Sequence, residues 1–369
     1  MKIVHITPYS MGRPGGVQSN IRDLSAWLCA QGHEVRIVAP PGNTDIPGLM
    51  TLGGCRPLTV HGTQFELTRA RRPEVKACVE ELRDWGAEVV HLHTPWTPMM
   101  VWQMWRALQL PSVATFHATL PENSGFDPVA MLLRRSATYF NKRLTSVVVP
   151  SQGVRDQWAA QRASPLPRIL PPAVDLSLWR KAGLTSQSSD VLKVVYMGRL
   201  EQRKGVSVLL DAWAKAHKAI PEAQLIIAGD GSEEGALRDQ AAKSGTGGIT
   251  FRSSPDNEEA RTLVASADLF IAPALHGESF GLVLAEAMAA GTVPVAAANS
   301  GYATVLSGAG QDLLVPPGQP EALADKIIEL AEHPAKLDRM RTWALSQAQR
   351  FDIRTVGPAY EAIYHSALT

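Results

Sequence analysis

The chain has 369 residues, 45% of them hydrophobic and 19% charged, with a formal net charge of +1. These values exclude a disordered protein, and the length is too great for one ordinary core, so two domains are expected. The small net charge gives no reason to expect a nucleic-acid partner.

Neither the cysteines nor the apolar segments indicate a secreted or membrane-spanning protein. Cys29, Cys55 and Cys78 lack C-x-x-C spacing, which argues against a zinc ribbon and a disulfide framework. The first residues have a strand pattern rather than that of a signal peptide, and no run approaches the ~18 apolar residues that span a bilayer. We expect a cytoplasmic protein, one that can still lie on the inner face of the cytoplasmic membrane.

Short β-rich segments alternate with helical segments in the first part of the chain, as in parallel α/β domains. The clearest helix is predicted over 17–31, where apolar residues recur on one face and Gly32 follows as a stop. The predicted strands are 2–7, 34–39, 88–93, 112–116 and 146–150.

The same alternation restarts after residues 164–190, a segment rich in proline and serine. We interpret this segment as the interdomain connection plus a variable loop. Beyond it the pattern predicts strands at 191–197, 223–228, 268–273 and 293–297, helices at 205–218 and 280–290, and a helix that ends at 267. A last helical pattern covers 356–368. The predicted domains are 1–172 and 173–355.

The most informative stretch is 276–291. Glu278 lies just before the helix predicted at 280–290, where unpaired backbone N–H groups attract anions. Glu286 lies further along that helix, at most roughly 12 Å away at 1.5 Å per residue. This spacing suits a ligand with two hydroxyl-rich ends and a doubly charged middle, such as a nucleotide-diphosphate sugar. For two glutamates at this spacing without further matching residues, the better explanation would be a helix-capping Glu278 and a solvated surface Glu286.

The residues around these carboxylates make the match specific. The segment 277–291 resembles the signature of the retaining glycosyltransferases of family 4, which have the α/β GT-B fold of two Rossmann-like domains facing a cleft. The resemblance implies that Glu278 contacts hydroxyls of the donor sugar and Glu286 the ribose. It further implies a terminal helix, about 356–369, that crosses back onto the N-terminal domain. The other donor-binding residues implied in this stretch are Ser279, Phe280, Gly281 and Leu282.

A basic pair follows the strand predicted at 191–197. Arg199 and Lys204 would supply two cations to a departing diphosphate, one as a planar fork and one as a point charge. A basic surface loop is the alternative, but the strand, the flanking glycines and the Arg-to-Lys interval match family 4. Arg203 lacks this support and is predicted to be solvated.

Glycine-rich turns are further donor-binding candidates. Gly15 and Gly16 lie between the first predicted strand and helix, where a phosphate can approach the backbone. A nicotinamide-binding protein would need G-x-G-x-x-G there and an acid after the second strand, whereas this chain has Pro40. Gly229 lies in another glycine-rich turn, where the need for a tight turn by itself explains the glycine. The resemblance places this loop near the nucleotide.

Histidines follow or occupy two predicted strands. His117 lies at a carboxyl end, where open α/β sheets bind ligands, and the resemblance assigns it to the active site. His91 and His93 alternate on one strand and point the same way. We assign them to the core or cleft lining, because no third metal ligand is nearby in the sequence. With no D-x-D motif in a suitable turn, we expect no cofactor and no metal requirement.

Within family 4, the chain is similar to the bacterial phosphatidylinositol mannosyltransferases. Tyr9, Gln18 and His117 match positions that meet the acceptor headgroup in those enzymes. Pro121 and Glu122 stand where those enzymes carry a lysine. The acceptor therefore stays open between lipid-linked and saccharide hydroxyls.

The resulting prediction is a retaining hexosyltransferase of glycolipid or cell-surface polysaccharide synthesis, using a GDP- or UDP-linked sugar of the mannose or glucose type. The implied route is front-face substitution, in which the leaving phosphate oxygen takes the acceptor's proton. The predicted catalytic residues are His117, Glu278, Arg199 and Lys204. A sugar-nucleotide epimerase or phosphorylase of the same fold, or a non-catalytic nucleotide-sugar-binding protein, is the alternative.

The composition of residues 128–172 predicts contact with an anionic membrane surface. Cations with interleaved apolar residues outnumber the single acid there, as in an amphipathic basic surface helix. A solvated helix that packs its apolar side on the domain explains the pattern equally well.

Overall fold

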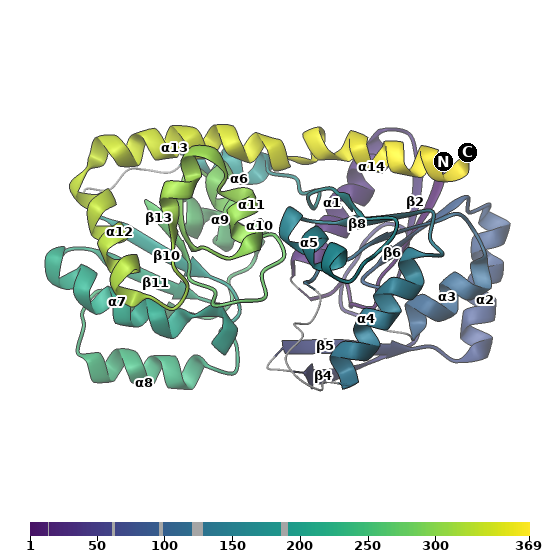
Figure 1. The fold of residues 1–369 in the computed structure, drawn as a ribbon, viewed down its shortest axis with the longest axis horizontal. Coiled ribbons are helices and arrows are strands. Elements are labelled where there is room, and N and C mark those ends of the chain that lie inside the picture. Colours follow the sequence, from purple (N-terminus) through teal and green to yellow (C-terminus); the bar gives the residue numbers. More distant parts are fainter. Residues whose placement is uncertain (14, 61–62, 96–98, 120–127, 186–190) are drawn as a thin grey trace. The chain divides into compact units, whose positions relative to one another are not determined.

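The structure is a computed structural model that describes residues 1–13, 15–60, 63–95, 99–119, 128–185 and 191–369. The chain divides into two compact units: unit 1 comprises Met1–Val174 and Asp352–Thr369, and unit 2 comprises Asp175–Phe351. The division therefore falls slightly after the predicted boundary at 172. The last helix, α14 (Ile353–Leu368), belongs to unit 1 and packs on its first helix and on two of its strands (Figure 1).

Unit 1 is built on a seven-stranded parallel sheet with the order β3-β2-β1-β6-β7-β8-β9. The strands are β1 (Lys2–Ile6), β2 (Glu34–Ala39), β3 (Leu49–Thr51), β6 (Val89–His93), β7 (Ser112–Thr115), β8 (Ser146–Val149) and β9 (Arg168–Ile169). The helices besides α14 are α1 (Gly16–Ala30), α2 (Arg72–Trp85), α3 (Met100–Leu108), α4 (Pro128–Asn141) and α5 (Gln152–Ala160). A separate antiparallel hairpin joins β4 (Gly54–Val60) and β5 (Thr63–Arg69).

Unit 2 repeats the plan with a six-stranded parallel sheet in the order β12-β11-β10-β13-β14-β15. The strands are β10 (Lys193–Met197), β11 (Gln224–Ala228), β12 (Ile249–Arg252), β13 (Leu269–Ala272), β14 (Val293–Ala297) and β15 (Leu314–Val315). The α-helices are α6 (Ser177–Thr185), α7 (Val206–Ala219), α8 (Glu234–Ser244), α9 (Asn257–Ala265), α10 (Leu282–Ala289), α11 (Ser300–Val305), α12 (Pro320–Glu332) and α13 (Pro334–Ala348). Short 3-10 turns are η1 (Gln202–Lys204), η2 (Gly308–Leu313) and η3 (Gln349–Phe351).

The strands of unit 1 divide its core between two faces of the sheet. Because side chains alternate along a strand, Val4 and Val90 pack with α2 and α3, whereas Ile3 and Val89 pack with α1 and α14. The second face also buries Tyr360 and Tyr364 of α14. Odd-numbered residues of β1 and β6 therefore meet α14, and the histidines of these strands have odd numbers.

The segment 164–190 contains the division between the two units, as interpreted, but it is not only connection and loop. It contains β9, which pairs with β8 at the sheet edge, and α6, which packs on α9 and α10. Gly183 of α6 lies so close to the backbone of Ala290 that a Cβ would come within 2.3 Å of its carbonyl oxygen. Proline and serine content concealed both elements, because a two-residue edge strand needs no apolar run and α6 has no fully buried side chain.

Across the described ranges, no helix is both long enough and apolar enough to cross a bilayer. The exposed apolar side chains of α4 are Met131 and Leu132 in its first turns, while Ala137 and Phe140 pack into the core. The apolar side of α4 beyond its first turns is thus covered by its own unit.

Candidate functional site

The loops that follow β10 and β13 form the centre of the predicted donor site in unit 2. These strands are parallel neighbours, so their carboxyl ends lie at the same edge of the sheet. Gly205, at φ 68°, lets the first loop approach the second: a Cβ there would lie 2.2 Å from the carbonyl oxygen of Pro273. This approach brings Lys204 and Glu278 together although 74 residues separate them.

Glu278 accepts hydrogen bonds from two cations through one oxygen. Lys204 Nζ lies 2.8 Å and Arg203 Nη1 2.9 Å from Glu278 Oε1, and the Glu278 side chain is only 12% exposed. Burial by itself raises the pKa of this carboxyl, but the charges and hydrogen bonds of Lys204 and Arg203 outweigh it and hold the pKa below its usual value. Glu278 is therefore an anion at neutral pH.

The prediction that Arg203 is solvated was wrong. Its side chain is 14% exposed, and its Nε also donates to Glu201 Oε2 at 3.0 Å. Arg203 thus links two carboxylates, a role that the spacing of family motifs does not reveal. An arginine is suited to it because its planar fork can bond two acceptors at once.

Arg199 is the exposed member of this network. Its Nη1 lies 2.8 Å from Glu201 Oε1, and its side chain is 54% exposed. Arg199, Arg203 and Lys204 supply three positive charges against those of Glu201 and Glu278, so the ion network carries a net charge of 3 − 2 = +1. An anionic group would be attracted to this edge.

Two glycines fix the loop that carries Glu278. Gly281 has φ 103° and caps α10, which explains why this helix begins at Leu282 rather than at 280 as predicted. A Cβ at Gly301 in α11 would lie 2.3 Å from the backbone oxygen of Glu278. This contact was not predicted from the sequence, where its signal is the helix start Asn299-Ser300-Gly301.

The remaining predicted donor residues lie in or near this loop. Phe280 is buried, and its ring packs edge-on against Phe351 at 5.3 Å. Ser279 and Glu286 are half-buried, and Glu286 lies on α10. At Gly229 a Cβ would approach within 1.9 Å of the oxygen of Gly198, so this glycine is required by a tightly packed turn.

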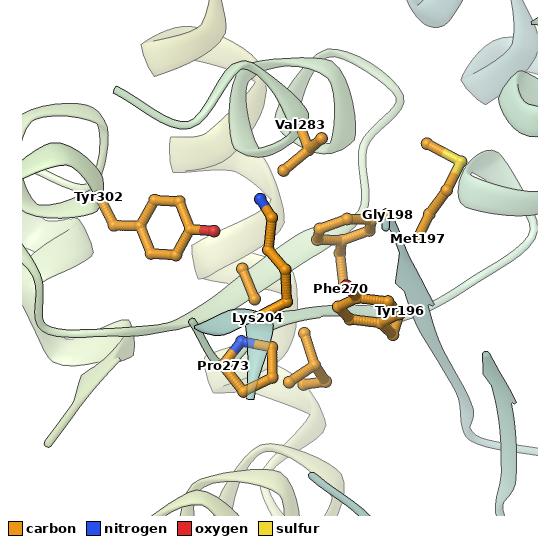
Figure 2. Close-up of a pocket in the computed structure, with 10 residues that line it drawn as sticks. Tyr196, Met197, Gly198, Lys204, Phe270, Pro273, Val283 and Tyr302 are labelled. Carbon is orange, nitrogen blue, oxygen red and sulfur yellow. The ribbon is translucent and has the colours of Figure 1, made fainter. Parts of the chain in front are cut away.

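A small cavity of about 40 Å³ lies beneath Lys204. Figure 2 shows the Lys204 side chain extending between Tyr302 and Val283, with Tyr196 on another side of the cavity. Because a ligand pocket usually measures about 300–1,000 Å³, this cavity is too small for a nucleotide sugar and has room for a few water molecules. Burial, and then the charge of Glu278, raises the pKa of both tyrosines, so they stay neutral.

In unit 1, the predicted acceptor residue Tyr9 lies in the turn from β1 to α1, and Gln18 lies in the first turn of α1. Gln18 is buried, and its Nε2 donates to the Ser10 carbonyl at 3.2 Å. A Cβ at Gly15 would lie 2.5 Å from Gln18 Oε1, and Gly16 is the first residue of α1. Tyr9 is half-buried. Pro121 and Glu122 lie outside the described residues.

The core assignment of His91 and His93 is confirmed, and the fold adds a third histidine that is distant in the sequence. His5 is the register partner of His91 on the neighbouring strand, and all three side chains are fully buried. His5 Nδ1 meets His93 Nε2 at 2.9 Å, and His93 Nδ1 meets His117 Nε2 at 2.9 Å. His91 bonds instead to the Tyr364 hydroxyl at 2.7 Å and to Thr115 Oγ1 at 2.8 Å.

This cluster is arranged for hydrogen bonding rather than for metal binding. Ligand atoms of His5, His91 and His93 lie within 4.8 Å of one another. The planes of His5 and His93 differ by 29° and those of His93 and His117 by 14°. Since imidazole lone pairs lie in the ring plane, these rings direct their nitrogens at one another rather than at a common point.

Comparison with known proteins covers both units. Residues 14–178 match the family model described as Glycosyltransferase Family 4, and residues 185–346 match the one described as Glycosyl transferases group 1. The chain is 32% identical over 378 residues to the phosphatidyl-myo-inositol mannosyltransferase of Mycobacterium leprae, covering 100% of this chain and 98% of the relative. It is 26% identical to the D-inositol 3-phosphate glycosyltransferase of Segniliparus rotundus, covering 99% and 88%.

Among solved structures, HepE of Anabaena in complex with UDP and glucose matches with a TM-score of 0.79 at 21% identity, over 99% of this chain and 100% of that one. Sucrose-phosphate synthase of Thermosynechococcus elongatus matches with a TM-score of 0.76 at 22% identity, over 99% and 98%. At such identities the likeness shows the fold, which is GT-B.

Proposed function

The chain belongs to glycosyltransferase family 4, and we propose that it transfers mannose from a nucleotide-diphosphate donor to a hydroxyl of an inositol-containing glycolipid acceptor, with retention of configuration. The relative of Mycobacterium leprae supports the sugar and the acceptor class, because its name carries both and the alignment spans both units. A GDP-linked donor is proposed because a relative that aligns over 60% of this chain, from Xanthomonas oryzae, is named for GDP-mannose.

The observation that carries this proposal is the ion network around Glu278. Arg203 holds the carboxylate, so that Glu278 can accept hydrogen bonds from donor-sugar hydroxyls while Lys204 and Arg199 meet the diphosphate. The bond from the sugar's anomeric carbon to the phosphate oxygen breaks, and the acceptor oxygen bonds to that carbon from the same face. The acceptor's proton passes to the leaving phosphate oxygen, whose charge the two cations stabilise.

In this proposal the donor belongs to unit 2, and the acceptor belongs to Tyr9, Gln18 and His117 of unit 1. Cations of the protein neutralise the diphosphate, so we propose that no metal is required and that transfer continues in a chelator. The free headgroup, an inositol phosphate, is the alternative acceptor, because the Segniliparus rotundus relative is named for it.

The test removes Lys204. In Lys204→Ala, Glu278 keeps the hydrogen bond from Arg203, so the carboxylate stays paired and the fold is expected to persist. Turnover with GDP-mannose and phosphatidylinositol vesicles should fall about 10²–10³-fold, the size typical of losing one electrostatic contact to a transition state. Lys215→Ala, which removes an exposed ion-paired lysine of the same unit, is the matched control. Undiminished turnover in Lys204→Ala would refute the donor assignment.

A donor panel identifies the nucleotide and sugar. Thermal shifts with GDP-mannose, UDP-glucose and the two free nucleotides rank the donors, since a ligand at 100 times its dissociation constant stabilises by about 2.7 kcal/mol. A shift with the UDP compound alone would reject the GDP-linked donor while leaving the transferase assignment in place.

A further inference from the structure

The register of the unit 1 sheet produces a diagonal row of imidazoles. His5 on β1 is level with His91 on β6, and His93 is level with Thr115 on β7. Each step from His5 to His93 and from His93 to His117 therefore moves one strand across and two residues toward the carboxyl end. Side chains two residues apart share a face, so all three rings lie on one face of the sheet.

The row is a continuous hydrogen-bond chain with two different ends. Both links measure 2.9 Å between ring nitrogens. At the inner end, His5 Nε2 is buried and has no hydrogen-bond partner among the described residues. The outer end, His117, is half-buried and follows β7 at the carboxyl edge.

These two ends determine which ring nitrogen donates in each hydrogen bond of the row. A neutral imidazole has one N–H and one lone pair, so the protons of three linked rings all lie on Nδ1 or all on Nε2. With every proton on Nε2, an N–H of His5 would be buried without an acceptor, and orphaned buried N–H groups are rare and costly. With every proton on Nδ1, only a lone pair of His5 is left unpaired.

Burial keeps the rings neutral. It lowers the pKa of His5 and of His117 to about 3, and that of His93 well below its ordinary value, where the other three imidazoles lower it further. Among the described residues, the titratable groups packed on this row are His91 of β6, beside His5 and His93, and the neutral Tyr364 of α14, edge-on to His5. The neutral Tyr360 of α14 packs on His91. A proton delivered to this row would thus meet no compensating negative charge from these groups.

We propose that His5 and His93 are positioning residues that hold His117 as a neutral ring with its proton on Nδ1, so that His117 offers substrate a hydrogen-bond donor and not a base. In its catalytic part this inference rests on the proposed function. It agrees with a route in which the leaving phosphate oxygen takes the acceptor's proton, because that route asks His117 only to orient an oxygen atom of the substrate.

The first test measures the unsubstituted protein without a substrate, and a variant serves only to assign its signals. Selective ¹⁵N labelling of histidine in the full chain distinguishes protonated from unprotonated ring nitrogens, and comparison with His117→Gln assigns the signals. We expect His117 to have Nδ1 protonated and Nε2 unprotonated, without change between about pH 5 and 8, the range in which an ordinary histidine titrates. A proton on Nε2, or titration of the ring in this range, would overturn the proposal.

The second test breaks the chain at its middle. His93→Phe keeps a ring at this position but cannot hydrogen-bond, so His117 should populate both tautomers and kcat should fall about tenfold, the size of one hydrogen bond, with KM for the donor unchanged. Tyr364→Phe is the control, because it removes a hydrogen bond of His91 and leaves both hydrogen bonds of the imidazole row intact. If the His117 tautomer is unchanged in His93→Phe, the proposal that His93 positions His117 is contradicted. If the tautomers are as expected but the unsubstituted protein transfers no sugar, the proposed function is rejected instead.

Discussion

Lys204 and Arg203 meet on a single oxygen of Glu278, and this arrangement explains two properties of the residue. The carboxylate stays ionised despite its burial, because two cations outweigh the loss of solvation. It also holds one orientation, since both donors come from the η1 turn. A group that is buried, charged and fixed is suited to recognising hydroxyl groups.

A prediction at the scale of a single residue concerns Gly301, whose substitution keeps every charged side chain of the ion network. In Gly301→Ala the new Cβ would lie 2.3 Å from the backbone oxygen of Glu278, so the loop must move. We expect a loss of about 1–3 kcal/mol in the free energy of unfolding, together with weaker donor binding. Urea unfolding and donor titration measure the two effects.

The matched control is Gly235→Ala. Gly235 is also helical but exposed, and a Cβ there meets nothing within 4 Å. This substitution should stabilise by up to about 1 kcal/mol and leave donor binding unchanged. Equal behaviour of the two variants would contradict the close approach of α11 to the Glu278 loop.

At the scale of elements, α14 serves both packing and the site. It buries Tyr360 and Tyr364 against the histidine-bearing face of the unit 1 sheet, and its Tyr364 hydroxyl bonds to His91. The helix that closes the chain therefore forms part of the surroundings of His91, on the strand next to His117. The contact between Tyr364 and His91 could not be predicted from local sequence patterns.

Helix α4 provides the element-scale prediction about membranes. Its exposed Met131 and Leu132 lie near the exposed Arg135 on the same helix, a combination that favours an anionic lipid surface. We expect sedimentation with anionic vesicles and not with zwitterionic ones. The double variant Met131→Ser, Leu132→Ser should weaken this binding. Equal sedimentation with both vesicle types would refute it.

At the scale of the whole molecule, the buried histidines make stability depend on pH. An unfolded histidine has a pKa near 6.5 and binds a proton below it, whereas folded His5 and His117 stay neutral until about pH 3. Their contribution is therefore fully present above about pH 6.5 and is lost as the pH falls toward 3, by up to about 1.4 kcal/mol per pH unit for each histidine.

Hydrogen exchange of the β6 and β7 amides at several pH values isolates this effect in unit 1. His5→Leu should reduce the slope of stability against pH by the share of one histidine. If the slope of His5→Leu matched that of the wild type, the lowered pKa of His5 would not contribute to acid sensitivity.

Local patterns predicted most elements of both sheets. Strands β2 and β14 have the predicted bounds, β1, β6, β7, β8, β10 and β11 differ by one or two residues at one end, and β13 is one residue shorter at each end. Several elements escaped: the short strands β3, β12 and β15, the hairpin β4–β5, and helices such as α2, α3, α8, α12 and α13 were not identified. In addition, α6 and β9 were hidden in a segment that looked like a linker. These have weak or misleading composition, which is the only signal a local pattern supplies.

The sequence by itself determined the two-unit α/β architecture and the family, and it singled out Glu278 and Lys204 as candidate donor-binding residues, because periodicity and motif spacing are local properties of the chain. Only the tertiary structure decided that Arg203 joins Glu278 across 75 residues and that His5 meets His93 across 88. Strand register and loop approach set these contacts, and both depend on how distant segments pack. The ion network around Glu278 and the imidazole row leading to His117 are therefore products of packing, which joins residues singled out by motifs to Arg203, His5 and His93, whose local patterns gave no sign of these contacts.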